Sequence, residues 1–310
     1  MGSGPEIALV LHPHRDPGPV LDEIGKWATS HGSRLLVRER DSARWDGEAT
    51  AVSDAELTER ADAVVSIGGD GTMLGALRLV ARRPVPVLGV NLGRLGFLVE
   101  VQPEELMDAL DRLERSDFTI EEHNALWLGA DADEAVAFND LALVRVPGEG
   151  VVEATLAVGG QRMGRYRCDG LVISTSIGST AYAYSAGGPV VSPALDAVVV
   201  AALAPLGGIS RPMVTAADEP IRLALQDGSG TPAIEVDGTI LRQTEPGEVL
   251  DVRLKLGCGQ VVRLDSDRHQ RRNQVKLSLL DLPFLPDELR ELAPHGSLPG
   301  APAPPRALEP

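Results

Sequence analysis

The sequence predicts an α/β N-terminal domain with an open sheet, followed by an all-β, sandwich-like C-terminal domain. Strand-like and helix-like runs alternate as far as residue 113, and short β-like runs follow one another from residue 118 to residue 267. Alternating strands and helices indicate parallel strands joined by crossover helices. Many short strands separated by Gly, Asp and Pro are typical of a β-sandwich.

The N-terminal half contains four short runs that are rich in aliphatic residues. They are IALVLH, RLLVRE, AVVSI and VPVLGV, which begin at residues 7, 34, 63 and 85. Between them, helical spacing places a set of apolar side chains on one face of a first helix: Val20, Leu21, Ile24, Trp27 and Ala28. A later helix over 103–113 has Pro103 in its first turn and one apolar stripe: Leu106, Ala109, Leu110 and Leu113.

These patterns divide the chain into two domains and two C-terminal pieces. Residues 1–117 form the α/β domain that carries the sequence GGDGT, and residues 118–268 form the sandwich-like substrate domain. Residues 269–293 are a C-terminal segment that could return to the first domain, and the Pro-, Ala- and Gly-rich tail 294–310 is expected to be disordered. The basic stretch 268–276 is predicted to be a solvated loop.

Composition limits the possible partners and location. The 310-residue chain has a formal net charge of -16, which repels nucleic acids and anionic membrane surfaces, so neither is expected as a partner. The spacing of Cys168 and Cys258 suggests neither a disulfide framework nor a zinc site. The sequence shows no signal peptide, lipidation pattern or membrane span, and we expect a cytoplasmic protein.

A phosphate-handling loop is predicted where the run AVVSI leads into Gly68 and Gly69. Unpaired amides at the start of the following helix, with the helix dipole, form an anion site, and Thr72 is placed to cap that helix. Asp70 stands within this loop, where a carboxylate can act as general base toward a hydroxyl or help to hold Mg²⁺. The alternative is a plain Asp-Gly turn.

A second segment, CDGLVISTSIGSTAYAYSAGGPVV, spans residues 168–191. Asp169 and Gly170 open a short strand, which leads through Gly178 into a helical start made of small residues. Hydroxyls near a helix N-terminus can bind sugar and phosphate oxygens, and the ring of Tyr182 can stack on a base. A tightly packed strand-to-helix corner that needs small residues explains the segment equally well.

Two further pairs of polar residues could be functional. Asn139 and Asp140 stand at a strand start, where an amide and a carboxylate can bind a ribose diol or an adenine edge. An Asx turn explains that pair equally well. Asp237 and Gly238, within IEVDGTIL, are more typical of a hairpin turn.

Taken in this order, the segments resemble the NAD kinase family, which transfers a phosphoryl group to the 2'-hydroxyl of the adenosine ribose of NAD. The motifs that carry the resemblance are GGDGT, VLGVNLGRLGFLVE, the Asn-Asp pair, DGLVIST, GSTAY, SAGGP and the late VDG. They cover about residues 7–267, and their combination is far more specific than any single motif. The resemblance implies an α/β domain joined to a β-sandwich, with the site in the crevice between them.

The resemblance also implies roles for individual residues. Asp70 would be the base that activates the 2'-hydroxyl, with Gly71 and Thr72 beside it and phosphate at Gly68 and Gly69. The residues implied to bind the dinucleotide are Asn139, Asp140 and Asp169 for the nicotinamide nucleotide, and Thr180, Ala181, Tyr182 and Ser185 for the adenosine pocket. The family further implies Mg²⁺ or another divalent cation, ATP or polyphosphate as donor, and a homodimer or homotetramer in which a neighbouring subunit often completes the NAD site. The metal ligands stay unassigned.

The chain departs from the family pattern in ways that concern the substrate more than the chemistry. Ile177 lies in the substrate-pocket motif, where the family usually has a ligand-facing hydroxyl. Leu206 stands where a histidine is usual, and Thr239 where a glutamine is common. Two alternatives therefore stay open: a kinase for a hydroxyl of another nucleoside-like or small-molecule metabolite, and a non-catalytic dinucleotide-binding module. Asp70 argues against the second, because a silent site needs no base.

Overall fold

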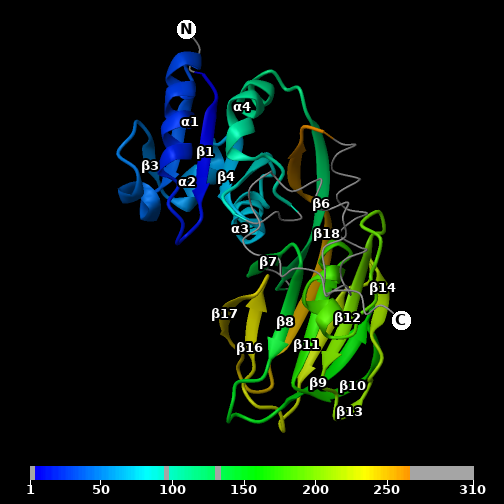
Figure 1. Cartoon of the computed structure of the whole chain (residues 1–310). Helices are drawn as coiled ribbons and strands as arrows, with labels where there is room; N and C mark the ends of the chain where they lie inside the picture. Colours follow the sequence, from blue (N-terminus) through cyan, green and yellow to red (C-terminus); the bar gives the residue numbers. More distant parts are fainter. Residues whose placement is uncertain (1–3, 94–97, 130–133, 266–310) are drawn as a thin grey trace, which may run out of the picture. The chain divides into compact units, whose positions relative to one another are not determined.

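The structure is a computed structural model that describes residues 4–93, 98–129 and 134–265 (Figure 1). The chain divides into two compact units, Met1–Leu264 and Asp265–Pro310. Three features predicted from the sequence lie outside the described residues: the basic stretch 268–276, the segment 269–293 and the tail 294–310. No helix in the described part of the chain is both long enough and apolar enough to span a membrane.

The N-terminal half is an open parallel sheet, as predicted, and helices cover both of its faces. Its strands lie in the order β3-β2-β1-β4-β5. Their bounds are β1 (Glu6–Leu11), β2 (Arg34–Arg38), β3 (Thr50–Val52), β4 (Ala63–Gly68) and β5 (Pro86–Asn91). The helices are α1 (Gly18–His31), α2 (Asp54–Arg60), α3 (Asp70–Val80) and α4 (Leu106–Glu114), with short 3₁₀ turns η1 (Glu39–Arg44) and η2 (Pro103–Glu105).

Alternate side chains along the strands pack against different helices. Ile7 and Leu9 of β1 lie in one cluster with the apolar residues of α1 and α4, whereas Ala8 and Val10 lie in another with those of α2 and α3. Successive strand residues point to opposite faces, so a strand that is covered on both faces is apolar throughout. This explains why IALVLH and AVVSI show no polar alternation.

The strand order reverses between β1 and β4. From β1 the sheet continues outward to β2 and β3, and the chain then crosses back to add β4 and β5 on the other side of β1. In open α/β sheets, ligands bind beyond the carboxyl ends of the strands at such a reversal. His12 follows β1 there, Gly69 follows β4, and the backbone N–H of His12 donates to the Ile67 carbonyl at 2.9 Å.

The C-terminal half is a sandwich of two facing sheets, which confirms the predicted class. One sheet has the order β14-β12-β11-β8-β16-β17. Its strands are β8 (Asp140–Val144), β11 (Gly170–Thr175), β12 (Ala197–Leu203), β14 (Met213–Ala216), β16 (Ala233–Val236) and β17 (Thr239–Gln243). The facing strands are β6 (Thr119–Leu128), β7 (Ala135–Ala137), β9 (Val152–Val158), β10 (Gln161–Cys168), β13 (Gly207–Gly208), β15 (Ile221–Leu225) and β18 (Val249–Arg263). Both sheets contribute to one buried aliphatic cluster, and Cys168 and Cys258 are free and buried.

One strand differs from the sequence prediction. The runs VLDVRLKL and VVRLDSD, which the sequence indicates as separate strands, belong largely to the single 15-residue strand β18. Its pairing with β6 is irregular between Lys255 and Gly259, where Gly257 has a φ of 63°. Beyond that bulge, Val261 of β18 pairs in parallel with Val87 of β5. One 12-stranded sheet therefore continues through both halves, while the predicted boundary at residue 117 falls between α4 and β6.

Candidate active site

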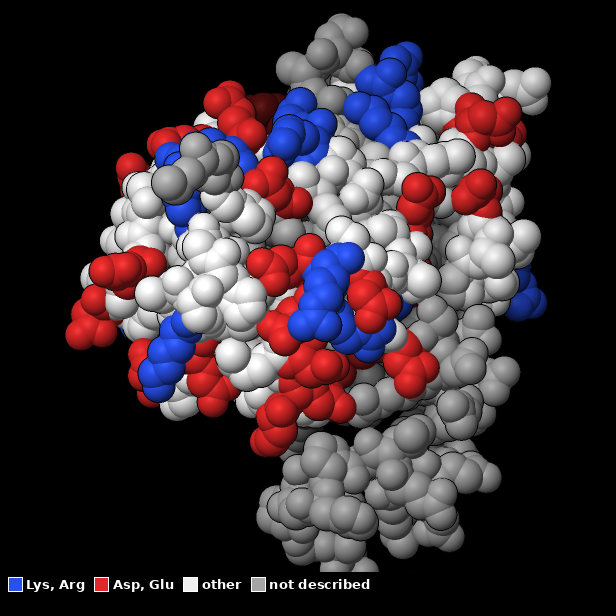
Figure 2. Space-filling view, turned by 90° about the horizontal axis from the view of Figure 1, so that it is seen from above, with Lys and Arg blue, Asp and Glu red and all other residues white. Residues whose placement is uncertain are grey.

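Charged side chains of both signs are intermixed on the face shown in Figure 2. A chain with a formal charge of -16 repels a triphosphate at long range, so the site must hold phosphate through local donors. The carboxyl ends of β1 and β4 supply such donors.

The GGDGT loop begins a helix earlier than predicted. Gly69 is the N-cap of α3 and Asp70 is its first residue, so the predicted cap at Thr72 is wrong. Thr72 lies in the first helical turn, buried against Gly68, where a Cβ would collide with the Thr72 hydroxyl. The first amides of a helix have no carbonyl of the preceding turn to bind, and with the helix dipole they favour an anion. Phosphate binding by this loop stays a prediction, and it rests on these amides and on the helix dipole.

Asp70 is half-buried and held by the backbone rather than turned out to bulk water. Its Oδ1 accepts the backbone N–H of Leu98 at 2.9 Å. The Leu98 carbonyl in turn accepts Nη1 of Arg263 at 2.9 Å, and Arg263 Nε donates to Glu121 at 2.6 Å. This chain of hydrogen bonds ties the orientation of the Asp70 carboxylate to strands β6 and β18.

A cationic loop that the sequence analysis missed follows β1. The guanidinium of Arg44 donates to the carbonyls of His12 and Arg15 at 2.8 and 2.7 Å. The pKa of His12 is lowered by burial, and further by the positive charges of Arg15, His14 and Arg44. The sequence signal was the run HPHR at the end of the first predicted strand, where this fold binds ligands.

Arg15 lies next to the GGDGT loop through one intervening segment. Its Nη1 donates to the carbonyl of Leu92, whose own N–H donates to the Gly68 carbonyl at 2.9 Å. The guanidinium packs where a Cβ of Gly93 would otherwise stand. Within the part of the chain that the structure describes, no carboxylate forms an ion pair with Arg15. An exposed arginine without a carboxylate partner, beside helix-start amides, suits a phosphate group.

The second predicted segment forms a tight corner on the backbone of Asn139. After β11, the chain makes the 3₁₀ turn η3 (Ile177–Thr180) and the single helical turn α5 (Tyr182–Ser185). The hydroxyl of Thr175 donates to the carbonyl of Phe138 at 2.7 Å and accepts the N–H of Gly178 at 3.0 Å. A Cβ on Gly178 would collide with the carbonyl of Asn139, so only glycine allows this approach.

The side chains of this corner differ in their availability to a ligand. The half-buried ones are Ile177, Thr180, Ala181 and Tyr182, and Ser185 is exposed. Ser179 is buried, and its hydroxyl accepts the backbone N–H of Val191 at 2.9 Å. One hydroxyl of GSTAY is therefore structural, as the packed-corner alternative predicts, and the hydroxyl of Thr180 donates to the carbonyl of Ile177 at 3.3 Å.

The structure brings Asp140 and Tyr182 together. Asp140 is 3% exposed, and its carboxylate accepts the backbone N–H of Tyr182. Burial raises the pKa of Asp140 to about 7, and the negative charges of Asp237 and Glu235 add to this rise. The pKa of Tyr182 is also raised, by burial and by Glu235 and Asp140. Asn139 is half-buried, and its side-chain amide forms no hydrogen bond with any described residue.

Asp237 has a second role besides the predicted hairpin turn. The turn is confirmed, because Asp237 and Gly238 join β16 to β17 with φ values of 47° and 75°. The carboxylate is also fully buried, and it accepts the backbone N–H groups of residues 138–140 at 3.2, 2.7 and 3.2 Å. Nη1 of Arg78, from α3, donates to it at 2.6 Å. The pattern VDG predicted the turn but gave no sign of these contacts.

Asp169 lies apart from the other predicted residues. It precedes β11, whereas the Ile177–Thr180 turn follows that strand, so the strand's length, roughly 20 Å, separates them. Asp169 forms an ion pair with Arg145 Nε at 2.9 Å. Within one subunit, this carboxylate is not part of the corner that holds Asp140 and Tyr182.

The described residues offer a divalent cation single carboxylates such as that of Asp70. They contain no group of three or more His, Cys, Asp or Glu side chains that could form a metal site by themselves. Mg²⁺ commonly takes one or two carboxylates, several waters and the phosphates of its substrate. Asp70 at the start of α3 fits that kind of site.

The comparison with known proteins identifies the family. Residues 22–118 match the ATP-NAD kinase N-terminal domain, and residues 138–257 match the ATP-NAD kinase C-terminal domain. The NAD kinase of Rhodopirellula baltica is 35% identical over 230 residues, which cover 73% of each chain. The NAD kinase of Hydrogenovibrio crunogenus is 39% identical over 235 residues, covering 73% of this chain and 81% of that relative. This chain belongs to the NAD kinase family.

Solved structures share the NAD kinase fold. An NAD kinase from Archaeoglobus fulgidus in complex with ATP superposes with a TM-score of 0.67 at 26% identity, covering 88% of this chain and 98% of that one. Yeast NADH kinase complexed with NADH gives a TM-score of 0.78 at 21% identity, covering 91% and 90%, and shows likeness of fold. The loop that carries Arg15 precedes the part of the chain that matches the NAD kinase N-terminal domain.

Proposed function

We propose that this chain transfers the γ-phosphoryl group of ATP to the 2'-hydroxyl of the adenosine ribose of NAD. The observation that carries the proposal is the position of Asp70: it is half-buried, opens α3, and follows a strand at the reversal of strand order. Relatives at 35% and 39% identity are named NAD kinase, and the similar Archaeoglobus protein was solved with ATP.

The donor binds at the ends of β1 and β4 in this proposal. The amides of Gly69, Gly71 and Thr72 and the guanidinium of Arg15 hold the phosphates in place. Asp70 and the phosphate oxygens would hold Mg²⁺, and the cation would neutralise part of the negative charge of the triphosphate. Polyphosphate offers the same phosphate oxygens, so a direct comparison of the two donors decides between them.

The acceptor binds at the corner built on residues 138–140. Asn139, Asp140 and the half-buried ring of Tyr182 hold the dinucleotide, with Thr180 and Ala181 along the pocket and Ser185 at its edge. Asp70 removes the proton from the 2'-hydroxyl as the ribose 2'-oxygen attacks the γ-phosphorus. The bond from the γ-phosphorus to the bridging oxygen breaks, and ADP leaves with the electron pair. NADP is the product.

A second subunit completes the site in this proposal. Asp169 lies at the far end of β11 from the corner, so it serves a nucleotide bound mainly by a partner copy. We therefore propose a homo-oligomer, in which each Asp169 faces its neighbour's site, and we propose the cytoplasm as its location. The mass of the purified protein in solution, by light scattering, tests the assembly.

The test of the activity uses purified full chain with Mg²⁺, ATP or polyphosphate, and NAD, NADH or assorted nucleosides, with products identified by mass. The expected product is NAD with one added phosphate. Asp70→Asn should lower turnover by about 10³-fold, because it removes the base. Asp46→Asn, at an exposed position, is the control for the loss of one charge. Phosphate on another metabolite but not on NAD, or wild-type turnover of Asp70→Asn, contradicts the proposal.

A further inference from the structure

The turn between β16 and β17 carries a buried carboxylate that joins two parts of the proposed site. Four donors surround Asp237: the N–H groups of residues 138–140 and the guanidinium of Arg78. The exposed fraction of the Asp237 side chain is 0%, and that of Arg78 is 26%. A fully buried charge persists only where hydrogen bonds and an opposite charge compensate it, and here both are present.

These contacts come from two different segments of the proposed site. The N–H groups of residues 138–140 set the backbone position of Asn139 and Asp140, which are the proposed acceptor-binding pair. Arg78 lies eight residues after Asp70 on α3, about 12 Å along the helix axis. Asp237 thus fixes the acceptor pair from one side and the helix that begins with the proposed base from the other.

We propose that Arg78 and Asp237 are positioning residues, which set the place of the Asn139–Asp140 pair relative to α3 and so align bound NAD with Asp70. The inference rests on the proposed function. The two residues act through the backbone of 138–140 and through the helix.

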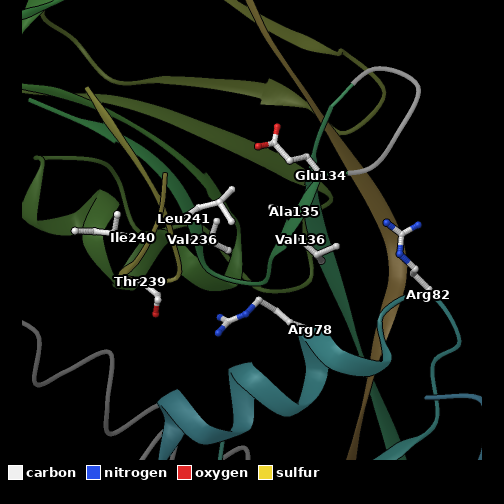
Figure 3. A pocket seen from close by; sticks show the side chains of 9 residues that line it. All are labelled: Arg78, Arg82, Glu134, Ala135, Val136, Val236, Thr239, Ile240 and Leu241. Carbon is white, nitrogen blue, oxygen red and sulfur yellow. The ribbon is translucent and has the colours of Figure 1, made fainter. Parts of the chain in front are cut away.

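Arg78 and Asp237 can be replaced by other side chains without a steric clash. Figure 3 shows Arg78 extending from α3 toward the hairpin, on the wall of a cavity of about 330 Å³. Val136, Val236 and Leu241 also line this cavity, so a shortened or uncharged side chain at position 78 has space around it. Asn at position 237 suits the turn, because Asn tolerates positive φ better than most residues and Asn-Gly is a preferred hairpin turn.

The experiment measures steady-state kinetics of the full chain for Arg78→Met, Arg78→Lys, Asp237→Asn and the double variant Arg78→Met/Asp237→Asn. We expect Arg78→Met to lower kcat/KM for NAD about tenfold, because it leaves a buried charge uncompensated. KM for ATP should stay within about twofold, because the donor end is unchanged. Arg78→Lys should recover part of the loss. The double variant should lose less than the product of the two single losses, since one interaction is removed twice.

A pH profile separates positioning from a simple loss of stability. The titratable groups facing Asp140 are the carboxylates of Asp237 and Glu235 and the neutral phenol of Tyr182, with Arg78 behind Asp237. Asp237→Asn removes a negative charge and should lower the pKa of Asp140. Arg78→Met removes the positive charge that compensates Asp237 and should raise the pKa of Asp140. The acid limb of kcat/KM for NAD should therefore move in opposite directions in the two variants.

Arg222→Met is the matched control, because it breaks another arginine–aspartate pair, with Asp251, on an exposed part of the sandwich. It should leave both substrates' constants unchanged. Asn139→Ala separates a failure of the proposed acceptor site from a failure of the positioning role. If Asn139→Ala leaves KM for NAD unchanged, the proposed acceptor site fails. If Asn139→Ala raises KM for NAD but Arg78→Met leaves the kinetic constants unchanged, the positioning role is wrong. It is also wrong if Arg78→Met changes the constants for NAD and ATP equally, or if the loss in the double variant equals the product of the two single losses.

Discussion

The two ends of the proposed site are built by different means. At the donor end, backbone amides at the start of α3 and Arg15 surround the loop, and Gly68 and Gly93 let neighbouring side chains approach closely. At the acceptor end, a buried carboxylate, Asp237, holds the backbone on which Asn139 and Asp140 stand. The donor end depends on chain direction and small residues, whereas the acceptor end depends on compensated buried charge. Substitutions at the two ends should therefore change different kinetic constants.

Among the substitutions that compare the two ends, the largest expected effect is at the acceptor corner. Gly178→Ala places a methyl group against the carbonyl of Asn139, and overpacking of this kind costs about 1–3 kcal/mol in the free energy of unfolding. Because the same shift displaces the acceptor pair, kcat/KM for NAD should fall by about 100-fold. Thermal unfolding and kinetics check the two effects together. Gly207→Ala, where a Cβ would meet nothing within 4 Å, is the control and should change neither. Normal NAD kinetics in Gly178→Ala would falsify the packing argument.

The next effect is at the donor end. Arg15→Met should raise KM for ATP about tenfold, because it removes a charged group that donates hydrogen bonds to phosphate. Methionine keeps an unbranched side chain over Gly93. KM for NAD should stay within about twofold. Initial rates at varied ATP and fixed saturating NAD measure the change, and Arg162→Met, at an exposed position of β10, controls for the loss of one positive charge. An unchanged KM for ATP, or an equal change for NAD, excludes Arg15 from the donor site.

A third effect concerns stability rather than turnover. Burial raises the pKa of Asp140 to about 7, above its ordinary value of 3.8. The folded protein therefore binds more protons than the unfolded chain between those values, and this group lowers stability as pH rises through that range. Asp140→Asn lacks the titration and keeps an oxygen for the N–H of Tyr182. Its melting temperature relative to wild type should rise between pH 5 and pH 8. A difference that stays flat with pH means that Asp140 does not titrate there.

The smallest effect tests the departure from the family pattern at Ile177. Threonine at this position restores a hydroxyl, and one net hydrogen bond is worth about 1 kcal/mol, so KM for NAD should fall about threefold to tenfold. Ile177→Val is the matched control, because valine has nearly the shape of threonine without the hydroxyl. If valine lowers KM as much as threonine, relief of crowding is the cause instead.

The sequence predicted much of the fold because its signals are local. Strand runs such as AVVSI and the turn VDG depend on neighbouring residues, and both are confirmed. The combination of GGDGT, GSTAY and the other motifs indicates the family from the sequence alone. The joining of two predicted runs into β18 could not be read from the sequence, because Gly257 interrupts the apolar pattern at the bulge. The pairing with β6 continues beyond the bulge, and the pairing with β5 begins there.

The predicted site lacked the residues whose roles come from distant contacts. Asp237 and Arg78 are 159 positions apart in the chain, and no local pattern pairs them. Arg15 lies only four residues after the end of β1, but its relevance depends on the strand order, which is a property of the whole sheet. The local sequence predicted the Asp237–Gly238 turn and the GGDGT loop. Their partners, Arg78 and Arg15, follow only from the topology of the sheets.

The separation of the two ends is tested most directly by the affinity of Asp70→Asn for NAD, measured by titration calorimetry on the purified full chain. If Asp70 acts on the reacting hydroxyl while residues 138–140 and Tyr182 hold the dinucleotide, the variant should bind NAD within about twofold of wild type despite its lost turnover. A dissociation constant raised tenfold or more would contradict the account, because it would make Asp70 a part of the acceptor-binding surface itself.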